Sequence, residues 1–153
     1  MTISPRGLFY RADRLPVAPW RKEGLPVVFH HGIGTNHQTW SDWLPAITSR
    51  HLAVQFDMRG FGASDIPPET HRWSIAELVD DLFDVADQVA KGPVHLVGES
   101  LGGTVVLAAA LARPERVASV AISNATYQGQ GVGRSPAGAP NSRNWGLPAG
   151  LSR

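Results

Sequence analysis

The chain contains no cysteine and no long apolar run, and each absence excludes a class of protein. Without cysteine among its 153 residues it has no disulfide framework, no thiolate metal site and no cysteine nucleophile. The longest apolar run, residues 104–112, is far shorter than the roughly 20 residues that cross a bilayer. We therefore expect no membrane association. Because residues 1–6 lack the apolar segment of a signal peptide, we expect a cytoplasmic protein.

The chain also has no excess of charge of either sign. Fourteen Lys and Arg residues against 13 Asp and Glu give a net charge of +1, and the basic residues are scattered along the chain. A nucleic-acid partner would require a basic stripe or patch, so none is predicted. Composition leaves the oligomeric state open.

Apolar runs alternate with helical patterns along most of the chain. Short apolar runs predict strands at residues 8–12, 26–30, 52–56, 94–97 and 117–123. Apolar residues three or four apart predict helices at residues 38–48, 75–89 and 101–112, the second opened by a capping box between Ser74 and Glu77. Continuously apolar strands alternating with helices predict an α/β fold with a doubly wound, mostly parallel sheet.

The composition changes after Tyr127. Residues 128–153 hold six glycines and three prolines and no acidic residue. Such a segment buries too little apolar surface to offset the entropy of ordering it. We therefore predict a folded region over residues 1–127 and an irregular or disordered tail over residues 128–153.

The motif Gly98-Glu99-Ser100-Leu101-Gly102 lies between a predicted strand and a predicted helix. A serine hydroxyl is a poor nucleophile until a base activates it and donors stabilise the oxyanion. A Gly-x-Ser-x-Gly turn holds the serine in a strained conformation, and the flanking Gly98 and Gly102 avoid side-chain clashes. We predict Ser100 as the nucleophile and the backbone N–H of Leu101 as one oxyanion-hole donor.

A second turn, His31-Gly32-Ile33-Gly34, follows the predicted strand at residues 26–30. An oxyanion hole needs two N–H donors aimed at one point. The predicted order of strands brings this turn toward Ser100. We therefore predict the backbone N–H of Ile33 as the second donor.

Three segments together resemble the α/β-hydrolase superfamily in residue type, order and spacing: residues 31–34, 57–65 and 98–103. The resemblance covers about residues 7–127, and Gly-Glu-Ser-Leu-Gly-Gly followed by Ala-Arg-Pro-Glu-Arg-Val is similar to the enol-lactonase, esterase and haloperoxidase-like branch. It implies a sheet of eight strands, usually with a cap inserted after the sixth, here residues 117–123. It also implies that His31 and Gly32 shape the oxyanion turn, and that Asp57 and Arg59 make local structural hydrogen bonds.

The chain departs from the family's catalytic triad, which runs serine, acid, histidine. After Ser100 the only carboxylate is Glu115, a predicted surface residue, and Asn124 stands where some members carry the acid. All six histidines precede Ser100: His30 and His95 in predicted core strands, His31 in the turn, and His37, His51 and His71 in loops or at edges. This pattern predicts a fragment, truncated after about the sixth strand or frameshifted, that is weakly active or inactive alone.

The function predicted is hydrolysis of a small-molecule carboxylic ester or lactone through an acyl-enzyme on Ser100. One alternative is a catalytically inactive fragment or a non-catalytic module with the same fold. Another is nucleotide binding, because Gly32-x-Gly34-x-x-His37 followed by Asp57 imitates a dinucleotide fingerprint. The third glycine is replaced by His37, whose side chain obstructs close packing, so we expect no cofactor. No metal site is predicted, and the sequence does not identify the ester.

Overall fold

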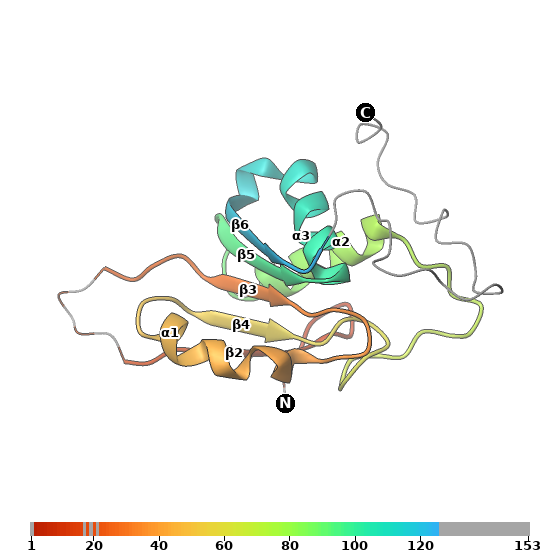
Figure 1. The fold of residues 1–153 in the computed structure, drawn as a ribbon, viewed down its shortest axis with the longest axis horizontal. Helices are drawn as coiled ribbons and strands as arrows, with labels where there is room; N and C mark the ends of the chain where they lie inside the picture. Colours follow the sequence, from red (N-terminus) through yellow and green to blue (C-terminus); the bar gives the residue numbers. More distant parts are fainter. Residues whose placement is uncertain (1, 17, 19, 21, 126–153) are drawn as a thin grey trace.

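The computed structural model describes residues 2–16, 18, 20 and 22–125. The predicted tail at residues 128–153 lies outside these residues, so the division of the chain at residue 127 stays a prediction. The strands are β1 (Thr2–Ile3), β2 (Phe9–Asp13), β3 (Val27–His30), β4 (Ala53–Phe56), β5 (Val94–Glu99) and β6 (Val117–Ser123) (Figure 1). The helices are the 3₁₀ helices η1 (His37–Trp43) and η2 (Pro114–Arg116) and the α-helices α1 (Leu44–Thr48), α2 (Ile75–Asp87) and α3 (Leu101–Ala112).

The six strands form one sheet in the order β1-β2-β4-β3-β5-β6. Strands β4, β3, β5 and β6 run parallel to one another, whereas β2 pairs antiparallel with both β4 and β1. The prediction of an α/β fold with a mostly parallel sheet is therefore confirmed. Because the carboxyl ends of the parallel strands share one edge, the residues that follow β3, β4, β5 and β6 gather there, which is where open α/β sheets bind ligands.

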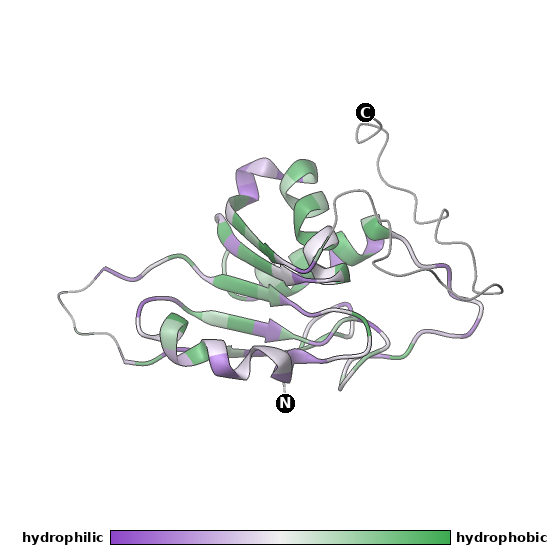
Figure 2. Cartoon of the chain, viewed as in Figure 1, coloured by the Kyte–Doolittle hydropathy of each residue, from purple (hydrophilic) through white to green (hydrophobic). Residues whose placement is uncertain are grey.

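Successive side chains of the central strands alternate between two apolar layers. Val28 on β3 and Leu96 on β5 face the layer that α2 and α3 cover, whereas Val27 and Phe29 face the layer that holds Trp40 of η1. The hydrophobic colouring in Figure 2 accordingly runs along β3 and β4 and over α3. Helices therefore cover both faces of the sheet, as the apolar strands predict.

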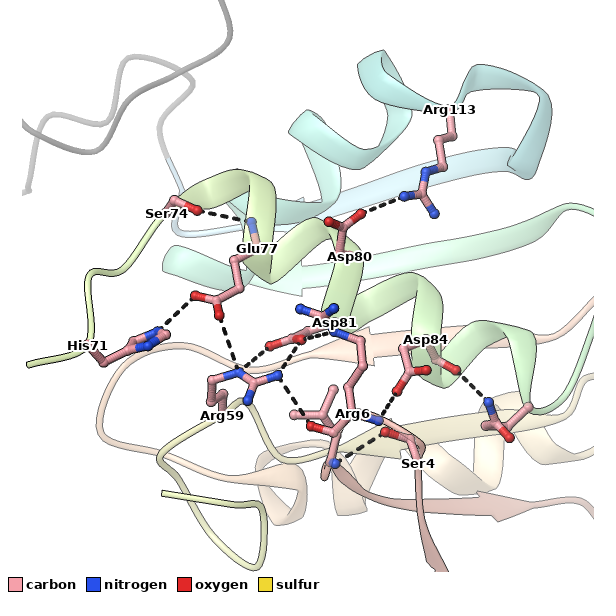
Figure 3. A network of polar contacts seen from close by, with 12 residues as sticks. Ser4, Arg6, Arg59, His71, Ser74, Glu77, Asp80, Asp81, Asp84 and Arg113 are labelled. Carbon is pink, nitrogen blue, oxygen red and sulfur yellow. Dashed lines mark hydrogen bonds and ion pairs between the residues drawn. The ribbon is translucent and has the colours of Figure 1, made fainter. Parts of the chain in front are cut away.

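Helix α2 shows the apolar spacing and the serine cap that the sequence predicts for it. Its buried apolar residues recur at helical spacing and face the sheet, and Ser74 Oγ accepts a hydrogen bond of 3.1 Å from the Glu77 N–H at its N-terminus. The predicted return contact from the Glu77 side chain to the Ser74 N–H is wrong. The Glu77 carboxylate instead meets His71 Nε2 at 2.8 Å and Arg59 Nε at 3.8 Å, because charged donors from the preceding loop lie beside it (Figure 3).

Candidate active site

Ser100 occupies the sharp turn between β5 and α3. Its backbone has φ +54° and ψ −122°, in the left-handed range that non-glycine residues rarely adopt. Such a conformation costs about 1–3 kcal/mol and persists only where the surroundings impose it. Here the Ser100 N–H donates to the Ser123 carbonyl of β6 at 3.1 Å, and the Ser100 carbonyl accepts from the Thr104 N–H of α3 at 3.3 Å. The turn is thus held from both sides.

The glycines around Ser100 let the backbones of α3, β5 and β3 approach closely. A Cβ on Gly98 would lie 2.4 Å from the Gly102 carbonyl oxygen, and a Cβ on Gly102 would lie 2.2 Å from the His30 carbonyl oxygen. Both obstacles are backbone atoms, which cannot rotate away. Gly98 and Gly102 therefore permit the close approach that the motif predicts, and their supporting role in catalysis stays a prediction.

The turn after β3 lies directly against the nucleophile. A Cβ on Gly32 would lie 2.8 Å from Ser100 Cβ, so this glycine leaves the space that Ser100 occupies. On the other side of Ser100, Leu101 begins α3, where the first helical N–H groups favour negative charge. The two predicted donors, the N–H groups of Ile33 and Leu101, thus belong to segments that flank Ser100. Their role as an oxyanion hole stays a prediction.

His31 is fully buried, and both of its ring nitrogens are engaged. Nε2 accepts a hydrogen bond of 2.8 Å from the Met58 N–H, so it carries no proton. Nδ1 then carries the proton and donates to the Gly32 carbonyl at 2.7 Å. Burial lowers the pKa of His31, which keeps the ring neutral. His31 therefore fixes the turn to the loop after β4 and has no free lone pair to deprotonate Ser100.

A second histidine at this edge, His37, forms a dyad with a buried carboxylate. Asp57 Oδ1 accepts hydrogen bonds from His37 Nδ1 at 2.8 Å and from the His37 N–H at 2.7 Å, and Oδ2 accepts from the Ala63 N–H at 2.8 Å. The bond from Ala63 is the local one that the sequence predicts, whereas the two bonds from His37 come from 20 positions away. Asp57 follows β4, which is two strands from β5 and hence about 10 Å across the sheet from the nucleophile's strand. The dyad bonds to the loop after β4, and no hydrogen bond joins it to Ser100 within the described ranges.

Arg59 does not make the local bonds that the sequence predicts. Its Nη2 and Nε donate to the two oxygens of Asp81 on α2 at 2.7 and 2.9 Å, and Arg6 Nε reaches the same carboxylate at 2.6 Å (Figure 3). The hydrogen bond with Asp81 raises the pKa of Arg59. Asp81 is buried, so two guanidinium groups offset the cost of removing its charge from water. This network joins the N-terminal segment, the loop after β4 and α2.

The remaining histidines make no hydrogen bond with Ser100 in the part of the chain that the structure describes. His30 is buried, as predicted, and its Nδ1 lies 2.9 Å from the His31 carbonyl; burial lowers the pKa of His30 to about 4. The prediction that His95 is a core residue is wrong: it is half-buried, and its Nδ1 pairs with Ser119 Oγ at 2.8 Å. Alternation along β5 points Val94 and Leu96 into the α3 layer and His95 to the opposite face, where η1 and α1 cover β3 and β4.

A comparison with protein-family sequence models identifies the family of this chain. The sequence model of the alpha/beta hydrolase fold matches residues 26–146, most of the chain. The chain belongs to the alpha/beta hydrolase fold family. The resemblance of its turn and serine motifs to this family is thereby confirmed.

Individual members of the hydrolase-fold family match the same region. A Caulobacter vibrioides protein with the provisional name carbamate hydrolase RutD is 33% identical over 121 residues, 77% of this chain and 42% of that protein. The 3-oxoadipate enol-lactonase 1 of Acinetobacter baylyi is 30% identical over 98 residues, 64% of this chain and 36% of the relative. A crystal structure of a hydrolase from Pseudomonas aeruginosa PA01 superimposes with a TM-score of 0.66 at 32% identity, covering 78% of this chain and 42% of that one.

The hydrolase-fold chain spans less than half the length of these relatives. Its sequence has no histidine after His95, and the described residue Glu115 is exposed in η2, before β6 begins and thus at the opposite edge from Ser100. Asn124 follows β6 with φ +50°.

Within the described ranges, no helix is long and apolar enough to cross a membrane.

Proposed function

We propose that this hydrolase-fold chain carries the nucleophile half of a serine hydrolase acting on small carboxylic esters or lactones. The observation that carries the proposal is the strained Ser100, φ +54°, held between the Gly32 turn and the start of α3. Strain of this kind is retained where the side chain has a chemical task. The names of the relatives, an enol-lactonase and hydrolases, support the same reaction class.

In the proposed reaction, Ser100 Oγ attacks the carbonyl carbon and the carbonyl oxygen takes up the electron pair. The N–H groups of Ile33 and Leu101 stabilise that oxyanion. The alkoxide leaves with the serine proton, which gives an acyl-enzyme and an alcohol, and water then releases the acid. For a lactone, the alcohol remains attached to the acyl group.

The proton transfer needs a base, and none of the described residues is placed to act as one on Ser100. His31 has both nitrogens engaged, and His37 Nδ1 is paired with Asp57, which follows β4, two strands from β5. We therefore propose that the triad's acid and histidine are not part of this chain. Loss of those partners costs several orders of magnitude in rate, while the oxyanion hole retains a residual acceleration.

The second candidate is a catalytically inactive module with the same fold. The engaged nitrogens of His31 favour it, because a serine without a base turns over slowly. The two candidates differ in whether the Ser100 hydroxyl reacts at all.

Hydrolysis of p-nitrophenyl acetate separates them. We expect the full chain to release p-nitrophenol faster than Ser100→Ala, with acetyl-Ser100 detectable by mass spectrometry because deacylation also lacks a base. Ser49→Ala, which removes an exposed hydroxyl from the end of α1, is the matched control and should behave like the parent. Equal rates for the parent and Ser100→Ala would remove Ser100 from the reaction and leave the inactive module.

A further inference from the structure

The residue before the nucleophile, Glu99, brings a carboxylate to the site. The same Cβ on Gly32 that would meet Ser100 Cβ at 2.8 Å would also meet Glu99 Oε2, so both side chains contact one glycine. Glu99 is the last residue of β5 and is half-buried. Its charge therefore lies at the predicted oxyanion turn, within a few ångströms of where a substrate's carbonyl would bind.

No cation of the described residues neutralises this carboxylate. Its one hydrogen bond there is from Asn124 Nδ2 to Oε1 at 3.4 Å, and an amide carries no charge. The nearby His31 is neutral because its Nε2 accepts from the Met58 N–H. The guanidinium groups of Arg6 and Arg59 are bonded to Asp81 of α2 (Figure 3).

We propose that Glu99 makes the Ser100 site select cationic and neutral esters over anionic ones. The proposal rests on the proposed function, since it names the substrate class for the same nucleophile. Two unit charges about 6 Å apart at an effective dielectric constant of about 40 change a rate or binding constant roughly tenfold. A cationic group on the substrate gains this factor, and a carboxylate loses it.

Three fluorophosphonate probes of equal length test the selection: one with a trimethylammonium tail, one with a tert-butyl tail and one with a carboxylate tail. The measured quantity is the second-order rate constant for labelling Ser100 at pH 7. We expect the order cationic, neutral, anionic for the parent, and a Glu99→Gln variant in which the cationic-to-anionic ratio falls by at least tenfold. Glutamine keeps the size of the side chain and its acceptor for Asn124.

Glu115→Gln is the matched control. It removes the same charge from the chain, but from an exposed position in η2 at the far edge of the sheet. We expect it to keep the parent's ratio. A Glu99→Gln ratio within twofold of the parent's, or an equal fall in Glu115→Gln, would overturn the proposal.

Equilibrium binding decides the matter independently of whether Ser100 reacts. Two variants, Ser100→Ala and Ser100→Ala/Glu99→Gln, are each titrated with three esters: acetylcholine, its uncharged isostere 3,3-dimethylbutyl acetate, and an acetate ester bearing a carboxylate. The NMR signals of the Gly32 and Leu101 amides report the binding. The proposal is supported if Ser100→Ala binds acetylcholine more tightly than the other two esters and this preference is lost in Ser100→Ala/Glu99→Gln. That result would support the charge selection even if no fluorophosphonate labels Ser100. Failure of labelling would count against the proposed function only. Equal affinities for all three esters in Ser100→Ala would overturn the charge selection.

Discussion

Replacement of Gly102 by alanine sets two physical effects against each other. Gly102 lies in the first turn of α3, and alanine in a helix is favoured over glycine by up to about 1 kcal/mol. Helix propensity alone therefore predicts that the substitution stabilises the protein.

The packing around Gly102 predicts the opposite sign. The added Cβ would lie 2.2 Å from the His30 carbonyl oxygen and 2.7 Å from the His31 carbonyl oxygen, well inside contact distance. Since these are backbone atoms of β3 and its turn, α3 has to move away from the sheet. Overpacking of this kind costs about 1–3 kcal/mol, and because two backbone atoms obstruct the added Cβ we expect the upper end of that range. Subtracting about 1 kcal/mol for helix propensity leaves an expected net loss of about 2 kcal/mol.

Urea unfolding followed by circular dichroism measures this difference in the free energy of unfolding. Gly92→Ala is the control, because a Cβ there meets nothing within 4 Å. It should shift stability by no more than about 0.5 kcal/mol. A Gly102→Ala variant as stable as the parent, or more stable, would refute the close approach of α3 to β3 on which the placement of Ser100 depends.

Three further predictions concern parts of the fold that position the site. His30 takes up a proton in the unfolded chain near pH 6.5 but in the folded chain only near pH 4, so the free energy of unfolding should fall by about 3 kcal/mol as the pH falls from 7 to 4, and His30→Gln should reduce that fall. Asp81→Asn should cost about 2–4 kcal/mol by urea unfolding because it leaves the half-buried Arg59 guanidinium without its charged partner, whereas Asp80→Asn, in an exposed ion pair, should cost less than about 1 kcal/mol; similar costs would contradict this account. Ser74→Ala should cost about 1 kcal/mol through loss of the α2 cap, and no change in urea midpoint would contradict it.

Patterns that depend on near neighbours were readable from the sequence. The apolar runs that become β3, β4, β5 and β6 and the helical spacing of α2 reflect burial on a fixed local period. The serine motif also predicts correctly that Ser100 lies in the turn between a strand and a helix. The five residues of the motif include the glycines that this tight turn requires.

Features that depend on distant partners were not readable. Strand β1 has two residues, and it exists only because β2 pairs with it. Arg59 bonds to Asp81, 22 positions away, whereas the sequence predicts hydrogen bonds within its own loop. The predicted helix at residues 38–48 begins as the 3₁₀ helix η1, capped by Asn36, a distinction that hydrophobic spacing does not make.

The central claim is that the strained serine after β5 is a reactive nucleophile. The most direct measurement is site mapping by mass spectrometry after treatment of the full chain with the neutral fluorophosphonate. The account predicts a single adduct on Ser100 that disappears in Ser100→Ala and weakens in Gly102→Ala. An unmodified Ser100, or an adduct shared equally with exposed serines such as Ser49, would contradict it.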